Sequence, residues 1–348
     1  MDGRPLRIIQ WATGNIGLRA LRAVIEHPAM QLVGLHSRAP EKLGTDAGTL
    51  CGLSETGIRA TSSVAELVAT PADCVLYMRE RTDVDELAAL LSSGKNIVTT
   101  RGDFHHPRSM DPALRSRIEA ACLAGQASIH STGSSPGFAT EALVAPLLSL
   151  QRRLDCLTID EYADLSSRNS PDLLFRVMGY GQPIGPYDQR RAQHVKADFA
   201  ASLAQIADAV GLPCDDFDAV GEYAAPAGRI GIAAGVIEPG QVAAQRVTIT
   251  GRRAGQPRFR FRANWYCTRA LSPAASDWDL RPSGWRIRVE GDTPLDVGIG
   301  FPVAPEKYAA FTPGLTAHRA VNAVHAICAA RPGIRTTVEL PPILPLFG

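Results

Sequence analysis

The sequence predicts an α/β protein, with a doubly wound parallel sheet in its first half and a second α+β domain built on a largely antiparallel sheet. Short apolar runs alternate with amphipathic helical patterns up to about residue 150, which is typical of a parallel sheet covered by helices on both faces. After that point, apolar runs follow one another without intervening helices. The length of 348 residues suits about two domains, at roughly 150 residues each.

The first half contains five apolar runs of strand length, separated by helical patterns. The predicted strands cover residues 6–11, 31–35, 74–78, 96–100 and 127–130, and the predicted helices cover residues 16–26, 63–68, 82–92 and 111–124. Gly94 and Lys95 stand between a helical pattern and a strand pattern, where a helix commonly ends. We therefore predict a first domain over residues 1–150.

The second half is dominated by strand patterns. We predict a helix over residues 195–211 and strands over residues 245–250, 258–266, 284–290 and 295–301, with a turn-rich connection over residues 251–257. Arg258, Arg260 and Arg262 alternate with apolar residues, so one face of this sheet is expected to be basic and solvated. We predict a second domain over residues 151–312. A helix over residues 316–330, within a segment of about 313–348, is expected to pack back on the first domain.

Composition and charge exclude several classes of protein. The net charge of +1 gives no sign of a nucleic-acid partner, and no run of 18 apolar residues suggests a membrane partner. The first residues show no apolar segment followed by a cleavage site, so we do not expect secretion. The seven cysteines are odd in number and scattered, which indicates reduced thiols in a cytoplasmic protein and no metal site.

A phosphate-binding loop follows the first predicted strand. Residues 12–17 read Ala-Thr-Gly-Asn-Ile-Gly, which fits the pattern G-x-G-x-x-G except at its first position. Gly14 would let the backbone approach a pyrophosphate, and Gly17 would let the helix pack against the strand. The backbone N–H groups at the start of the helix would hold the phosphates. We therefore expect a Rossmann-type dinucleotide site that includes Thr13, Gly14, Asn15, Ile16 and Gly17.

The end of the second strand indicates which dinucleotide is bound. Proteins that bind NAD usually place an acidic residue there, to bond the ribose hydroxyls. Here Ser37 and Arg38 occupy that place, with Lys42 close behind. They could bond a 2′-phosphate, so NADP(H) is preferred and NAD(H) remains possible. Arg38 could equally be a surface arginine that lies over His36.

Several segments spread along the chain carry a resemblance to a known family. They are the loop at residues 12–17, Asn-Ile-Val-Thr-Thr at 96–100, Ser-Thr-Gly-Ser-Ser-Pro-Gly-Phe at 131–138, and the segment at 316–324. Together they resemble the dihydrodipicolinate-reductase-like family, in the group that contains 2,4-diaminopentanoate dehydrogenase and the native amine dehydrogenases. The resemblance implies a homodimer that interconverts a small amine and the matching carbonyl plus ammonia, with NADP(H). It also implies that the second domain binds the substrate and forms the dimer.

The loop after residues 96–100 departs from this family. The amine dehydrogenases carry a glutamate there, where this sequence has Gly102 or its neighbour. Asp103 is one position away, and His105 follows. Reduction of C=O or C=N needs a proton donor, and an aspartate or a histidine can supply one. We therefore predict Asp103 and His105 as catalytic residues.

The remaining candidate residues lie in three segments. Thr100, Gly133 and Pro136 are expected beside the cofactor. Phe138, Tyr162, Asp164 and Arg168 are expected to bind the substrate, and the last three would share one face of an extended segment. Glu141 is interpreted as an acid in the first turn of a helix. Two other functions remain open, a dihydrodipicolinate reductase-like enzyme and a catalytically silent dinucleotide-binding protein.

Overall fold

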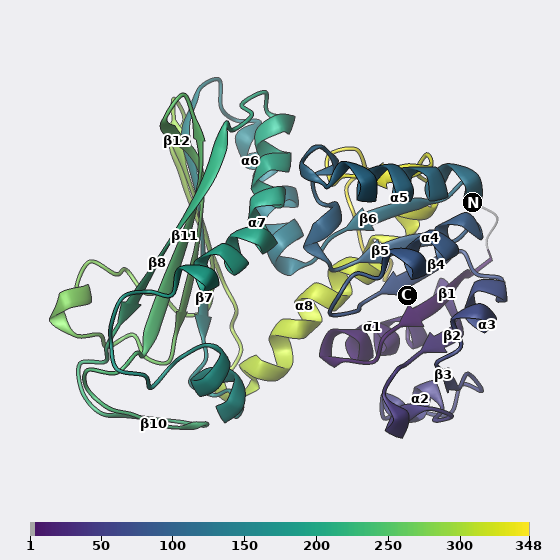
Figure 1. The fold of residues 1–348 in the computed structure, drawn as a ribbon, viewed down its shortest axis with the longest axis horizontal. Coiled ribbons are helices and arrows are strands. Elements are labelled where there is room, and N and C mark those ends of the chain that lie inside the picture. Colours follow the sequence, from purple (N-terminus) through teal and green to yellow (C-terminus); the bar gives the residue numbers. More distant parts are fainter. Residues whose placement is uncertain (1–3, 348) are drawn as a thin grey trace. The chain divides into compact units, whose positions relative to one another are not determined.

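The computed structural model describes residues 4–347, and its chain forms two compact units. The first unit contains the chain through Ala142 together with the segment from Pro313 onward, and the second contains Leu143–Thr312. The two units are coloured along the chain in Figure 1. Within residues 4–347, no helix is both long and apolar enough to cross a membrane.

The first unit is built on a seven-stranded sheet in which every neighbouring pair is parallel. Its strands are β1 (Leu6–Trp11), β2 (Met30–His36), β3 (Ala60–Thr61), β4 (Cys74–Tyr77), β5 (Asn96–Thr99), β6 (Ser128–Ser131) and β15 (Gly333–Arg335), in the order β15-β6-β5-β4-β1-β2-β3. The strand order turns back at β1, next to the phosphate loop. Such a switch point is where doubly wound sheets bind ligands.

Helices cover both faces of this sheet. The helices are α1 (Asn15–Ile25), α2 (Ala47–Leu50), α3 (Val64–Ala69), α4 (Val84–Ser92), α5 (Pro112–Gly125), α8 (Tyr308–Asn322) and α9 (Val324–Cys328). Ile8 belongs to a core with Leu21 of α1 and Ile327 of α9. Ile9 and Trp11 belong to a second core with residues of α4 and α5. Alternate residues of β1 thus belong to different cores, one on each face of the sheet, and the predicted doubly wound sheet is confirmed.

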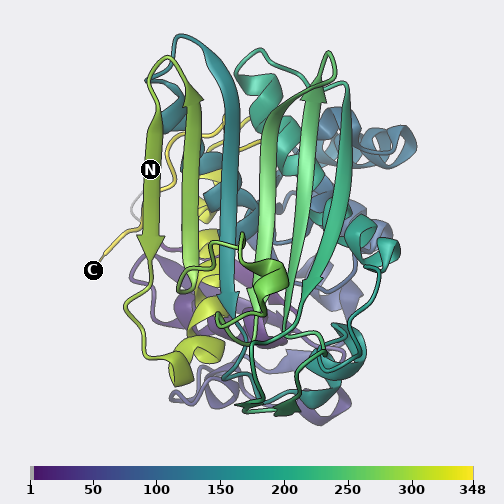
Figure 2. The same ribbon diagram turned by 90° about the vertical axis from the view of Figure 1, so that its left-hand side faces the viewer.

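The second unit is built on a six-stranded sheet, seen with its strands side by side in Figure 2. Its order is β14-β13-β7-β12-β11-β8, with β7 (Leu154–Asp164), β8 (Asp216–Ala224), β11 (Ala244–Arg253), β12 (Gln256–Tyr266), β13 (Gly284–Gly291) and β14 (Leu295–Gly300). Strands β7 and β12 run parallel and the other neighbours antiparallel, so the predicted, largely antiparallel sheet is confirmed. The unit also contains α6 (Val144–Leu148), α7 (Gln189–Ala209), β9 (Ile230–Ile232) and β10 (Gly235–Ile237).

Helix α7 packs on one face of this second sheet. Phe199 of the helix stacks on Phe261 of β12, with ring centroids 4.0 Å apart. The opposite face carries Arg262, whose Nη2 donates to the fully buried Asp160 at 2.9 Å. Arg288 donates to the same carboxylate at 3.0 Å. Two arginines of this face, Arg262 and Arg288, therefore share one buried carboxylate.

Three predicted elements need correction. The connection expected over residues 251–257 is shorter, because β11 extends to Arg253 and β12 begins at Gln256. The helix expected over residues 316–330 is two helices, α8 and α9, followed by the strand β15. The extended segment expected to reach Arg168 ends at Asp164, because the chain turns at Ser166 and Ser167 and Arg168 N donates to Leu165 O. Arg168 therefore does not continue the face that carries Tyr162 and Asp164.

Candidate cofactor and active site

The loop between β1 and α1 has the shape that a phosphate needs. Ala12 adopts a φ of +78°, at the position where the motif usually has its first glycine. Gly14 immediately precedes α1, and a Cβ built there would meet nothing within 4 Å. A Cβ at Gly17 would lie 2.2 Å from Ala12 O. The backbone before the helix is therefore open to a ligand, while Gly17 allows the loop to pack against the helix.

Gly17→Ala is expected to weaken the binding of NADPH and NADH alike, by more than about tenfold, because the new methyl group must push the loop away from α1. Isothermal titration calorimetry with each cofactor measures the loss. Gly228→Ala is the matched control, since a Cβ at Gly228 meets nothing within 4 Å and its backbone is unstrained. Unchanged affinity in Gly17→Ala would refute the assigned role of this loop.

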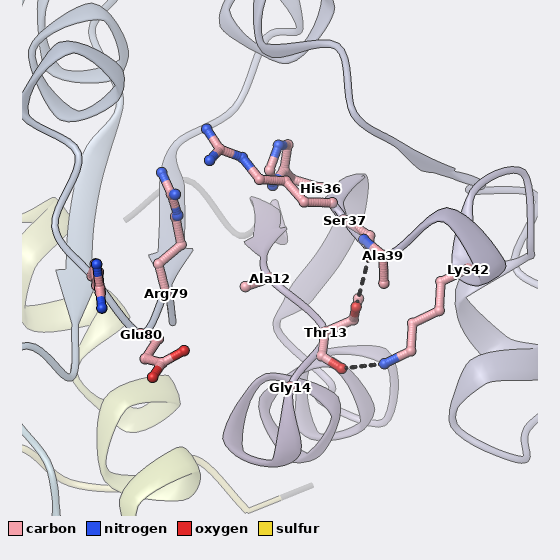
Figure 3. A pocket seen from close by; sticks show the side chains of 11 residues that line it. Ala12, Thr13, Gly14, His36, Ser37, Ala39, Lys42, Arg79 and Glu80 are labelled. Carbon is pink, nitrogen blue, oxygen red and sulfur yellow. Dashed lines mark hydrogen bonds between the residues drawn. The ribbon is translucent and has the colours of Figure 1, made fainter.

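A pocket of about 380 Å³ opens beside this loop (Figure 3). It lies within the first unit, and most of the charged residues that line it are cations. The lining residues are Ala12, Thr13, Gly14, His36, Ser37, Arg38, Ala39, Lys42, Arg79, Glu80 and Arg81. Four of them are cations and one is a carboxylate, so the pocket suits an anionic group.

Hydrogen bonds fix the wall formed by the ends of β1 and β2. Thr13 Oγ1 and Ser37 Oγ lie 2.9 Å apart, and Ala39 N donates to Ser37 Oγ at 3.3 Å. Lys42 Nζ donates to Thr13 O at 2.7 Å. Figure 3 shows Lys42 reaching the loop in this way. The two loops are thus held together before any ligand arrives, which lowers the cost of ordering the site.

A buried carboxylate outside the pocket lining holds two of its arginines. Glu86 is 5% exposed, and it accepts from Arg38 Nη2 at 2.7 Å and from Arg79 Nη1 at 2.6 Å. It also accepts from Trp11 Nε1 at 3.3 Å and from Tyr77 OH at 3.0 Å. Arg38 therefore lines the pocket while paired with Glu86, and its side chain is still 57% exposed.

Sequence reasoning found Ser37, Arg38 and Lys42 but missed Arg79 and Arg81. The missed pair follows β4, which pairs with β1 in the sheet. The carboxyl ends of neighbouring parallel strands meet at one edge. The basic residues directly after the apolar run at 74–78 could have predicted them as part of the anion-binding pocket.

The predicted catalytic loop follows β5. Asp103 lies in a short 3₁₀ helix, Gly102–Phe104, with 35% of its side chain exposed. Its Oδ2 accepts from Thr82 Oγ1 at 2.6 Å and lies 3.4 Å from Arg101 Nε. The loop is tied to the end of β6, because Ser131 Oγ donates to Arg101 O at 2.7 Å. Asp103 is thus an accessible carboxylate at the carboxyl edge of the sheet.

His105 differs from Asp103 because its side chain is buried. His105 Nδ1 lies 2.6 Å from Glu141 Oε1, and each side chain is 1% exposed. The other carboxylate oxygen of Glu141 accepts from Thr337 Oγ1. Glu141, which the sequence analysis interprets as an acid in the first turn of a helix, is thus buried and paired with two side chains. It anchors the loop that carries Asp103.

The other predicted cofactor residues lie after β5 and β6. Thr100 directly follows β5, and Thr132 N donates to Thr99 O at 2.9 Å. Gly133 and Pro136 lie in the turn before a helical segment, where Phe138 N donates to Gly133 O. The guanidinium of Arg319 lies 5.7 Å from the ring centroid of Phe138. These residues share the edge of the sheet that carries the phosphate loop.

The remaining predicted substrate residues lie in the second unit. Tyr162 is 5% exposed and packs with Tyr266 and Ala275. Asp164 accepts from Ser166 N at 2.9 Å, so its carboxylate closes the turn that ends β7. Arg168 is half-buried in the following loop. Within residues 4–347, no three His, Cys, Asp or Glu side chains form a group that could hold a metal ion.

The parallel sheet, the phosphate loop at its switch point and the adjoining anion pocket define a dinucleotide-binding protein of the doubly wound class. Residues 8–108 match the family model of the N-terminus of dihydrodipicolinate reductase. The chain is 26% identical to an amine dehydrogenase of Streptomyces virginiae, over 98% of this chain and 97% of that protein. The resemblance inferred from the sequence is therefore confirmed.

Solved structures agree on the fold. An amine dehydrogenase from Mycobacterium smegmatis has a TM-score of 0.76 with 19% identity, over 97% of each chain. A myo-inositol dehydrogenase from Lactobacillus casei, solved with NAD(H) and myo-inositol, has a TM-score of 0.57 with 10% identity, over 95% of this chain and 89% of that one. The chain is an oxidoreductase that depends on a nicotinamide dinucleotide.

Proposed function

We propose that the enzyme uses NADP(H) to interconvert a small amine and the matching carbonyl compound plus ammonia. The observation that supports NADP(H) is the pocket beside the phosphate loop, whose lining includes the cations Arg38, Lys42, Arg79 and Arg81. A 2′-phosphate is the group that distinguishes NADP(H) from NAD(H), and clustered arginines suit it. The amine chemistry is supported by the name of the Streptomyces virginiae relative.

The described residues fit this cofactor. Thr13, Gly14, Asn15, Ile16 and Gly17 would hold the pyrophosphate, because the backbone before α1 is open at Gly14. Ser37 and Arg38 would hold the 2′-phosphate. Thr100, Gly133 and Pro136 would flank the nicotinamide, which supplies or accepts the hydride when it is bound.

Asp103 is proposed as the group that moves the proton to or from the substrate heteroatom. Its carboxylate is partly exposed and is oriented by the hydrogen bond from Thr82. A carboxyl group held in this way can donate or accept a proton during reduction or oxidation of the bond. His105 is buried against Glu141, so we propose that it acts by fixing the loop and does not touch the substrate.

Phe138 is proposed as a substrate-binding residue of the first unit. Asp164 and Arg168 are proposed as substrate-binding residues of the second unit. Tyr162 lies near the end of β7 and packs with Tyr266 and Ala275, so it would support that end of the strand. We propose that the second unit also forms a homodimer, as the resemblance implies. Cytoplasmic localisation is proposed because all seven cysteines are free thiols.

The first experiment is a spectrophotometric assay of NADPH and NADH consumption with short aldehydes and ketones, with and without ammonium. Ammonium-dependent consumption of NADPH is the expected result. Consumption without ammonium would replace the amine reaction with carbonyl reduction. No consumption by protein that still binds NADPH would exclude these substrates and favour the silent dinucleotide-binding alternative.

Arg38→Ala is expected to raise the KM for NADPH at least about tenfold more than the KM for NADH, because a charge-assisted hydrogen bond to the 2′-phosphate is lost. Steady-state kinetics with both cofactors test this difference. Arg117→Ala is the matched control, since Arg117 pairs with Asp85 at the surface. Equal increases for the two cofactors would refute the 2′-phosphate assignment.

A further inference from the structure

One pocket residue remains without a role in the site described so far. His36 ends β2, lines the pocket, and is 1% exposed. Its ring stacks on Trp11, with centroids 4.1 Å apart and planes 10° from parallel. Among residues 4–347, neither His36 Nδ1 nor His36 Nε2 has a hydrogen-bond partner. A buried polar group without a partner is unusual in a folded protein and points to a missing ligand or water.

The charge state of this imidazole follows from its surroundings. Burial lowers the pKa of His36 to about 4. Glu86 favours the protonated ring, while Arg38 and Arg79 oppose it. The ring is therefore neutral at physiological pH and carries one N–H donor and one acceptor nitrogen. A neutral donor surrounded by arginines matches a ligand that brings acceptor atoms and negative charge.

The position of His36 in the strand adds a second argument. NAD-binding sheets place a carboxylate at the end of the second strand, where it accepts from the ribose hydroxyls. Here β2 ends at His36 and is followed by Ser37 and Arg38, so this strand end offers hydrogen-bond donors and no carboxylate. A carboxylate at this position accepts hydrogen bonds from the ribose hydroxyls. The N–H group of His36 would instead donate a hydrogen bond to an oxygen atom of the ligand.

We propose that His36 donates a hydrogen bond to the 2′-phosphate of NADP(H) and is a specificity-determining residue of this pocket. The proposal rests on the proposed preference for NADP(H), and it adds a neutral, buried donor to the cations that line the pocket. Glu86 orients Arg38 and Arg79, whereas Trp11 holds His36 by stacking. The phosphate would therefore be bound by an uncharged imidazole N–H group as well as by the positively charged side chains of the pocket.

His36→Phe is the decisive variant, because it keeps an aromatic ring on Trp11 and removes both nitrogens. Titration calorimetry of the full-length protein with NADPH, NADH, 2′,5′-ADP and 5′-AMP measures its effect. We expect NADPH and 2′,5′-ADP to bind about tenfold more weakly, while NADH and 5′-AMP change by less than about twofold. His36→Gln retains an amide donor and is expected to recover part of the lost affinity.

Thermal unfolding without ligand provides an independent measurement. Because the ring nitrogens have no partner in the empty pocket, His36→Phe is expected to leave the Tm unchanged or to raise it. His325→Phe is the matched control. His325 lies in α9, 5.9 Å from the His27 ring, and does not line the pocket. That control is expected to leave all four affinities unchanged.

The outcomes separate this inference from the proposed function. If the wild-type protein binds 2′,5′-ADP no more tightly than 5′-AMP, both the NADP(H) preference and the role of His36 are overturned. If the wild-type protein prefers 2′,5′-ADP and His36→Phe keeps that preference, only the role of His36 is overturned. Equal losses for NADPH and NADH would assign the ring to a ribose hydroxyl instead.

Discussion

Asp103→Asn is expected to lower kcat by about a hundredfold or more, while the Kd for NADPH stays unchanged. Asparagine has nearly the same shape and can still accept the hydrogen bond from Thr82 Oγ1. It cannot take up or release the proton, and general acid–base catalysis contributes about 10²- to 10⁴-fold in rate. Steady-state kinetics together with calorimetric titration of NADPH measure the two quantities separately.

Asp85→Asn is the matched control for this substitution. The side chain of Asp85 is 82% exposed and pairs with Arg117 at the surface, so we expect wild-type kcat. Wild-type kcat in Asp103→Asn would remove this residue from the chemistry. A weaker NADPH affinity with unchanged kcat would instead make the carboxylate part of the cofactor site.

Glu141→Ala is expected to lower the free energy of unfolding by about 2–4 kcal/mol, because each buried polar group left without its hydrogen-bond partner costs about 1–3 kcal/mol. His105 would lose its partner at 2.6 Å, and Thr337 Oγ1 would lose its acceptor. Glu141→Gln keeps the size and the acceptor oxygen, so its loss should be smaller. Urea unfolding of both variants measures these differences.

Glu119→Ala is the control, because the Glu119 side chain is 40% exposed and pairs with Arg115 within one helix. Such exposed pairs contribute about 0–1 kcal/mol. A loss in Glu141→Ala no larger than in Glu119→Ala would show that the buried pair is unimportant for stability. Our proposal further requires that Glu141→Gln lowers kcat more than it weakens NADPH binding, since the loop with Asp103 would be less firmly held.

The fold of the first unit could be predicted because its signals are local. The run at residues 6–11, the glycines at positions 14 and 17 and the helical pattern after them specify a strand, a turn and a helix within a short stretch. The phosphate loop could be placed for the same reason. Ala12 could not be interpreted from the sequence, since only the structure shows that alanine takes the positive φ usually left to glycine.

The parts that were missed depend on contacts between distant positions. Glu141 contacts His105 and Thr337, and the three residues come from separate segments of the chain. No residue spacing in the sequence predicts these contacts. Likewise, Glu86 of α4 bonds Arg38, although the two residues are 48 positions apart in the sequence. Arg168 was misplaced because two serines turned the chain where the alternating pattern suggested a longer strand.

The first unit takes its last strand from the far end of the chain. Strand β15 pairs with β6, and α9 fills the core that also contains α1. During synthesis on the ribosome, the nascent chain must therefore complete residues 143–312 before the first sheet can receive its seventh strand. Until then β6 presents an open edge, which invites pairing with other chains. The second unit lies wholly within one stretch of sequence, so its sheet needs no strand that is synthesised later.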